Sequence, residues 1–190
     1  HPWADKVRFS RAGGEANSIA VRIARAATGK EKVAICGYHG WHDWYLSTNL
    51  KNNSQLEEHL LPGLDPNGVP KALIGTVIPF SFNDLDKIKK IIKDNELAAI
   101  KMEVQRGEEP SKGYLQAIRD LCNEHKIILI FDECTSGFRE TFGGIHKKFG
   151  VNPDMAMFGK ALGNGYAITS VIGKSEIMDA AQKTFISSTF

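Results

Sequence analysis

The sequence lacks the features that mark membrane proteins, disulfide-rich secreted proteins and nucleic-acid-binding proteins. Its apolar runs fall far short of the roughly 18 residues that a membrane helix requires. Its three cysteines, Cys36, Cys122 and Cys134, are widely spaced and match no metal-ligand pattern, so we expect reduced thiols, a cytoplasmic location and no metal. It has no basic block and a formal net charge of only +2, so we expect neither nucleic acid nor a membrane as partner.

The two ends of the sequence predict a piece of a longer protein. The chain begins at His1 without an initiator methionine and stops at Phe190, directly after an apolar, β-branched stretch. We therefore expect both ends to be internal, and a targeting signal upstream of His1 would not be seen.

Expected strands and helices alternate along the chain. Short apolar runs predict strands at 32–36, 76–79, 97–102, 127–131, 155–158 and 168–172. Helical spacing predicts helices at 15–27, after a cap at Asn83, at 114–125, and at 175–182 after a cap at Ser175. Residues 37–75 predict irregular structure. The alternation predicts an α/β fold, in which helices flank a mostly parallel sheet.

The pairing of Asp132 with Lys160 is the strongest chemical signal. Each follows an apolar run that predicts a buried strand, and side chains at the carboxyl ends of such strands share a crevice. A buried carboxylate facing a buried amine is what pyridoxal phosphate chemistry requires. The alternatives are a structural ion pair between Asp132 and Arg139, and a surface position for Lys160.

Several weaker signals surround this pair. Gly13 and Gly14 open a helix whose N–H groups favour a phosphate, although an ordinary tight turn is equally consistent with them. Tyr38 follows a strand and can stack on a flat ring or simply cover the core. Glu103 ends another strand and can either orient a cofactor or pair with a neighbouring cation such as Lys101 or Arg106.

Two histidines also follow the second expected strand. His39 and His42, with Asp43, raise the question of a metal site. Their spacing places them on no shared helical face, so packed or solvated histidines are the favoured interpretation.

Taken in order, these motifs resemble the class III aminotransferases, which are fold type I enzymes that use pyridoxal phosphate. Within that family the chain looks closest to glutamate-1-semialdehyde aminomutase-like and sugar-type members. The resemblance covers essentially the whole chain. It rests on Gly13-Gly14-Glu15-Ala16, Tyr38-His39-Gly40, Phe131-Asp132-Glu133, Thr135-Ser136-Gly137-Phe138-Arg139, Phe149-Gly150-Val151-Asn152-Pro153-Asp154 and Phe158-Gly159-Lys160.

The resemblance implies a role for each matching residue. Lys160 would form the Schiff base with pyridoxal 5'-phosphate, and Asp132 would hold the ring nitrogen protonated. Thr189 would reach the phosphate of a neighbouring subunit in a homodimer with a shared active site. The full implied cofactor set is Gly13, Gly14, Glu15, Tyr38, His39, Glu103, Asp132, Cys134, Lys160 and Thr189.

The resemblance also implies an activity. Residues 1–190 would be the large cofactor-binding domain, without the family's amino-terminal segment and carboxyl-terminal small domain. The expected reaction moves an amino group from a small-molecule donor to a carbonyl acceptor. An aminomutase is the runner-up, and a non-catalytic homologue that serves only in binding or assembly is the alternative of another class.

The sequence departs from the family pattern at two places. Ala12-Gly13-Gly14 stands where Ser-Gly-Thr is common, so backbone N–H groups would have to bind the phosphate. Val104 replaces the proline that usually follows Glu103.

Overall fold

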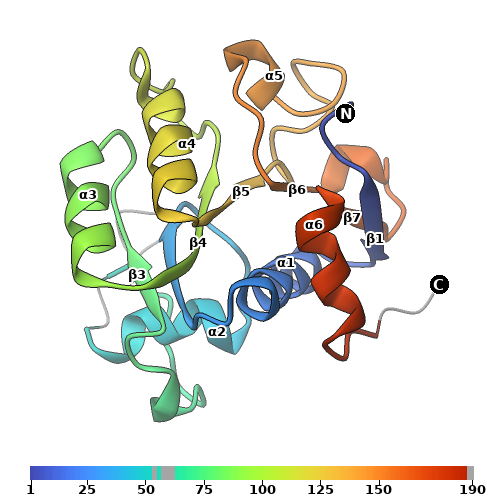
Figure 1. Ribbon diagram of the computed structural model, residues 1–190. Coiled ribbons are helices and arrows are strands. Elements are labelled where there is room, and N and C mark those ends of the chain that lie inside the picture. Colours follow the sequence, from blue (N-terminus) through green and yellow to red (C-terminus); the bar gives the residue numbers. More distant parts are fainter. Residues whose placement is uncertain (53–54, 57–62, 188–190) are drawn as a thin grey trace.

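A single seven-stranded sheet organises the chain (Figure 1). The computed structural model describes residues 1–52, 55–56 and 63–187. The strand order is β1-β7-β6-β5-β4-β2-β3. The strands are β1 (Lys6–Ser10), β2 (Lys32–Cys36), β3 (Val77–Pro79), β4 (Leu97–Glu103), β5 (Ile128–Asp132), β6 (Met155–Phe158) and β7 (Thr169–Gly173). β2 to β6 pair in parallel, whereas β7 runs antiparallel to both β6 and β1, which confirms the mostly parallel sheet.

Helices cover both faces of this sheet. α1 (Gly13–Thr28) packs on one face with α6 (Ser175–Met178), and α3 (Leu85–Asp94) and α4 (Tyr114–His125) lie side by side on the other (Figure 1). The shorter helices are α2 (Asp43–Leu46), η1 (Ser47–Leu50), η2 (Lys71–Leu73), α5 (His146–Phe149), η3 (Lys160–Leu162) and η4 (Asp179–Gln182). No helix in the described ranges combines the length and apolarity that a membrane span needs.

Most expected elements are present, with shifts at their ends. The α3 helix is capped by Asp84, whose carboxylate accepts the Lys87 N–H, and not by the predicted Asn83. Asn83 has a left-handed backbone, and its side chain instead accepts the Ser111 N–H. The expected helix 175–182 is divided into α6 and η4, and it begins after Lys174 and not after Ser175.

Two features were not expected from the sequence. The region 37–75 contains the short helices α2, η1 and η2. β1 forms an edge strand that pairs with β7, so the first and last described strands are neighbours.

The strand order reverses between β2 and β4. From β2 the chain passes outward to β3 and then returns to the other side of β2 as β4. In parallel sheets, such a reversal leaves the strand ends open to a ligand, on the carboxyl side. The carboxyl ends of β2, β4, β5 and β6 lie along this side of the sheet, and the predicted site residues follow them.

Candidate active site

Asp132 ends β5 and is held by three partners. Its Oδ2 lies 2.8 Å from His39 Nδ1 and 3.6 Å from Lys101 Nζ, and its Oδ1 accepts the Cys134 N–H at 3.1 Å. The side chain is only 4% exposed. The cations beside Asp132 are therefore His39 and Lys101, and not Arg139, which the sequence had offered as an alternative.

These partners keep Asp132 ionised. Burial alone would raise the pKa of the carboxyl, but the Lys101 charge and the His39 hydrogen bond hold that pKa well below its usual range. The result is a buried carboxylate at the carboxyl end of β5 that retains its negative charge at neutral pH.

Lys160 lies at the end of the neighbouring strand. β6 pairs with β5 so that Met157 is opposite Asp132, and Lys160 follows three positions later. Its amine is exposed and donates to Thr135 Oγ1 at 2.7 Å, so the expectation of a buried amine is wrong for the chain as described. Lys160 also has a left-handed backbone with φ of 46°, a strained conformation that is concentrated at functional sites.

The start of α1 lies beside Cys134 and the loop that follows β2. Ala12 provides no side-chain cap, so the first N–H groups of this 16-residue helix, at Gly13 and Gly14, are free to bind an anion. A Cβ on Gly40 would lie 3.1 Å from the Gly14 Cα, and one on Gly14 would lie 3.1 Å from His42 Nε2. The loop after β2 therefore packs directly on the start of the helix.

Two other predicted residues near α1 have structural partners. The Glu15 carboxylate accepts the N–H of Arg11 at 2.9 Å, as expected of an acid in the first turn of a helix. His42 Nδ1 lies 2.7 Å from Ser18 Oγ, whereas His39 turns to Asp132. The two histidines thus face different partners.

Glu103 lies beside Asp132, with which it pairs in register across β4 and β5. Its Oε2 accepts the Tyr38 N–H at 3.0 Å and an Arg106 N–H at 2.9 Å, so the expected salt bridge forms with Arg106. Burial raises the pKa of Glu103, which these two hydrogen bonds oppose. Glu103 thereby fixes the backbone of Tyr38, whose ring is half-buried.

Cys134 connects the helix start to both central strands. Its Sγ lies 3.6 Å from the position a Cβ would take on Gly13 and 3.3 Å from that on Gly159. Burial raises the pKa of this thiol, so it stays neutral and unreactive. The close packing shows that Gly13, Cys134 and Gly159, which are distant in sequence, meet at one place.

One predicted residue, Thr189, is outside the described residues.

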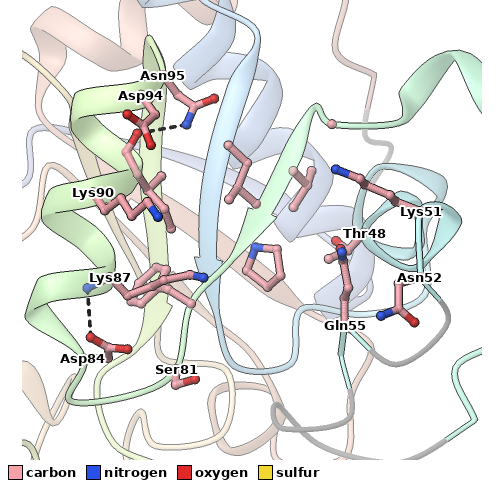
Figure 2. Close-up of a pocket in the computed structure, with 16 residues that line it drawn as sticks. Thr48, Lys51, Asn52, Gln55, Ser81, Asp84, Lys87, Lys90, Asp94 and Asn95 are labelled. Atoms are coloured by element: carbon pink, nitrogen blue, oxygen red, sulfur yellow. Dashed lines mark hydrogen bonds between the residues drawn. The ribbon is translucent and has the colours of Figure 1, made fainter.

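A large groove lies apart from the site residues described above. It has a volume of about 650 Å³ and opens between β3, α3 and η1, and Figure 2 shows polar side chains such as Thr48, Lys87 and Asp94 around it. Neither Asp132 nor Lys160 lines this groove, so its size does not identify the site.

Lys101 is the site residue that sequence reasoning missed. The sequence suggests it only as a partner of Glu103, whereas its amine pairs with Asp132. A signal was present, since a lysine interrupts the apolar run of a strand whose seven residues are all buried.

The arrangement brings four kinds of group to one edge of the sheet: an uncapped helix start, a buried carboxylate, a primary amine and an aromatic ring. The sequence as a whole, residues 1–190, matches the model of the family described as aminotransferase class-III. The chain belongs to the class-III aminotransferase family.

Curated class-III relatives match most of the chain. It is 41% identical over 201 residues to a 3-aminobutyryl-CoA aminotransferase of Cloacimonas acidaminovorans, with 100% of this chain and 44% of the relative covered. It is 39% identical over 186 residues to a glutamate-1-semialdehyde 2,1-aminomutase of Methanocaldococcus jannaschii, with 94% and 42% covered. The chain thus spans less than half the length of these relatives.

Solved transaminase structures share the fold. An omega-transaminase from Sphaerobacter thermophilus superposes with a TM-score of 0.84 at 29% identity, covering 100% of this chain and 46% of that one. A structure described as a transaminase with PLP bound superposes with a TM-score of 0.78 at 27% identity, covering 92% and 41%.

Proposed function

We propose that this chain is the cofactor-binding domain of a pyridoxal-phosphate-dependent aminotransferase. The observation that carries the proposal is the ionised, buried carboxylate of Asp132, in register beside the strand that leads to Lys160. The family membership and the solved neighbour that holds PLP support the same cofactor.

The residues present fit the chemistry of that cofactor. Uncapped N–H groups at Gly13 and Gly14 suit a phosphate, and the Asp132 carboxylate suits a protonated ring nitrogen. Tyr38 offers an aromatic face, and Lys160 offers the amine. When bound, pyridoxal phosphate supplies an aldehyde that condenses with amines and a ring that accepts electrons.

Each residue then has a definite task. Asp132 holds a proton at the ring nitrogen through its negative charge. Lys160 Nζ would act first as the base that removes the proton from the substrate carbon that bears the amine, and then as the acid that returns it on the other side of the amine nitrogen in a 1,3-proton shift. Thr135 Oγ1 accepts the hydrogen bond of the Lys160 amine and so orients it. The Glu103 carboxylate accepts the backbone N–H of Tyr38 and so holds this residue in place. The Cys134 thiol is neutral.

The substrates are an amino donor and a carbonyl acceptor. An aminomutase, which returns the amine to the same carbon skeleton, is the second candidate because of the aminomutase relatives. A product that forms from a single substrate without a separate donor would favour it over the aminotransferase.

The whole protein is proposed to be a cytoplasmic homodimer with a shared active site, in which Thr189 would reach the partner's phosphate. Phe142 and Tyr166 are 90% and 86% exposed, and such large exposed aromatics support a partner surface. The three cysteines are free and buried, which supports a reducing compartment. Sedimentation velocity of the full-length protein tests the dimer.

Chemical trapping tests the function. The full-length protein is incubated with pyridoxal phosphate, reduced with borohydride, digested and analysed by mass spectrometry. The cofactor should be found on the peptide that contains Lys160 and should be absent from it in Lys160→Ala, with exposed Lys112→Ala as the matched control. A cofactor attached to other lysines only, or equal labelling in Lys160→Ala, would support the non-catalytic alternative.

Asp132→Asn provides the second arm of the test. The amide cannot carry the negative charge, so transamination should fall by about 10²–10³-fold, while trapping at Lys160 persists. Unchanged turnover in this variant would remove the proposed role of Asp132.

A further inference from the structure

Lys101 is an unusual residue for the centre of a sheet. Its side chain is completely buried in β4, with Nζ 3.6 Å from Asp132 Oδ2 and 3.0 Å from Met157 Sδ. A thioether is only a weak acceptor, so the carboxylate is the strong partner. An ammonium in such a place costs several kcal/mol unless it is paired, so its presence calls for a reason beyond packing.

Asp132 is already engaged by a second cation. His39 Nε2 lies 3.1 Å from the Cys36 carbonyl oxygen, which can only accept, so Nε2 carries a proton. His39 Nδ1 faces Asp132 Oδ2 at 2.8 Å, and this contact needs another proton between them. Because Asp132 is held ionised, that proton belongs to His39, which is then an imidazolium.

The cluster therefore holds two cations and one carboxylate. Glu103 is the nearest other acid on β4, and Arg106 already neutralises it. The Cys134 thiol stays neutral, and Lys160, whose charge acts on that thiol, is exposed. α1 packs over this face and buries only uncharged side chains there. Burial lowers the pKa of Lys101 and the Asp132 charge opposes this, so the buried Lys101 ammonium depends on Asp132 to keep its proton.

We propose that Lys101 is a positioning residue of the cofactor site. Without the cofactor, Lys101 is the counter-ion of Asp132. When a cationic ring nitrogen comes to face Asp132, Lys101 releases its proton. This inference rests on the proposed function. The Nζ–H bond breaks, its electron pair stays on nitrogen, and the proton passes to solvent. Binding of the cofactor thus releases one proton, so the affinity of the protein for the cofactor rises with pH.

Calorimetry of the full-length apoprotein tests this. Pyridoxal phosphate is titrated at one pH in two buffers of different ionisation enthalpy, which yields the number of protons released. Wild type should release up to about one proton more than Lys101→Met, because methionine has similar length and no charge. The affinity of wild type should rise with pH by up to about tenfold per unit more steeply than that of the variant. Exposed Lys93→Met, on α3, should match wild type.

A second measurement requires no substitution, in case Lys101→Met does not fold. Wild type is titrated with N-methylated pyridoxal phosphate, whose ring is permanently cationic, and with the carbocyclic analogue, whose ring is never cationic. The cationic ligand should release about one proton more.

The outcomes separate the two proposals. Equal proton release by wild type and Lys101→Met, or by the two ligands, overturns the role of Lys101 while leaving the function intact. A wild-type protein that binds no pyridoxal phosphate overturns the proposed function itself.

Discussion

The carboxylate of Glu133 accepts hydrogen bonds from both the backbone N–H and the imidazole of His146, at 2.9 and 2.7 Å. His146 Nε2 accepts from Trp3 Nε1, so the imidazole proton is on Nδ1 and points to Glu133. The same carboxylate accepts from Ser136 and from the Ile145 N–H, and both Glu133 and His146 are fully buried. This arrangement fixes the loop that follows Asp132.

Replacing Glu133 with Gln should therefore destabilise the protein strongly. An amide nitrogen cannot accept, so buried donors would be left unpaired at a cost of about 2–4 kcal/mol. Denaturant unfolding measures the loss. Glu124→Gln, at a side chain 72% exposed, is the control and should stay within about 0.5 kcal/mol of wild type. Equal stability of the two variants would show that the Glu133 hydrogen bonds contribute little.

Gly37→Ala should disrupt the Glu103 contact. A Cβ at this position would lie 2.4 Å from Glu103 Oε2, and the glycine has φ of 102°. Gly29 is a matched control, since its φ is 68° and no atom lies near its missing Cβ. Gly29→Ala should cost about 1 kcal/mol for backbone strain alone. Gly37→Ala should cost at least about 1–3 kcal/mol more, and similar losses in the two variants would contradict the tight contact.

Alkaline pH should weaken the fold through Cys122. Burial raises the pKa of this thiol to about 12, whereas an unfolded cysteine titrates near 8.5. Between these two pKa values the thiol keeps its proton in the folded state and loses it in the unfolded state. The free energy of unfolding is therefore unaffected by this thiol below about pH 8 and falls progressively as the pH rises above that value. Unfolding free energies measured between pH 7 and pH 10 should fall less steeply for Cys122→Ala than for wild type. Parallel slopes would show that the thiol does not titrate differently on unfolding.

Asp84→Ala should remove the cap of α3. Its carboxylate accepts the Lys87 N–H at 2.8 Å, and loss of such a cap costs about 1 kcal/mol. Asp86, 98% exposed in the first turn of the same helix, is the control. Thermal unfolding that affects Asp86→Ala as much as Asp84→Ala would assign the effect to the helix dipole instead of the cap.

The sequence was sufficient for the parallel part of the sheet, because strands such as β5 and β6 are continuous apolar runs. β1 was missed for a physical reason. It is an edge strand with the mixed composition of Lys6–Ser10, and its partner β7 lies at the other end of the chain. The cap of α3 was misplaced by one residue because Asn83 and Asp84 are both good caps, and only the backbone conformation distinguishes them.

The positions of the two main site residues could be predicted from the sequence, but the ion pairs around them could not. Asp132 and Lys160 follow clear strand signals, and the structure places them on adjacent strands. The pairing of Lys101 with Asp132 depends on the register of β4 against β5, which local patterns do not specify. The exposure of Lys160 depends equally on what covers the end of β6, and no pattern of residues within the strand determines that.

The pairing of β1 with β7 has a consequence for synthesis. Lys6 lies opposite Gly173, so β1 can pair with β7 only after β2 to β6, which lie between them in the sequence, have been synthesised. Val7 and Phe9 remain 46% exposed even when β1 is paired with β7. While the strands between β1 and β7 are being synthesised, β1 therefore lacks its β7 partner, and an unpaired strand edge is open to pairing with other chains.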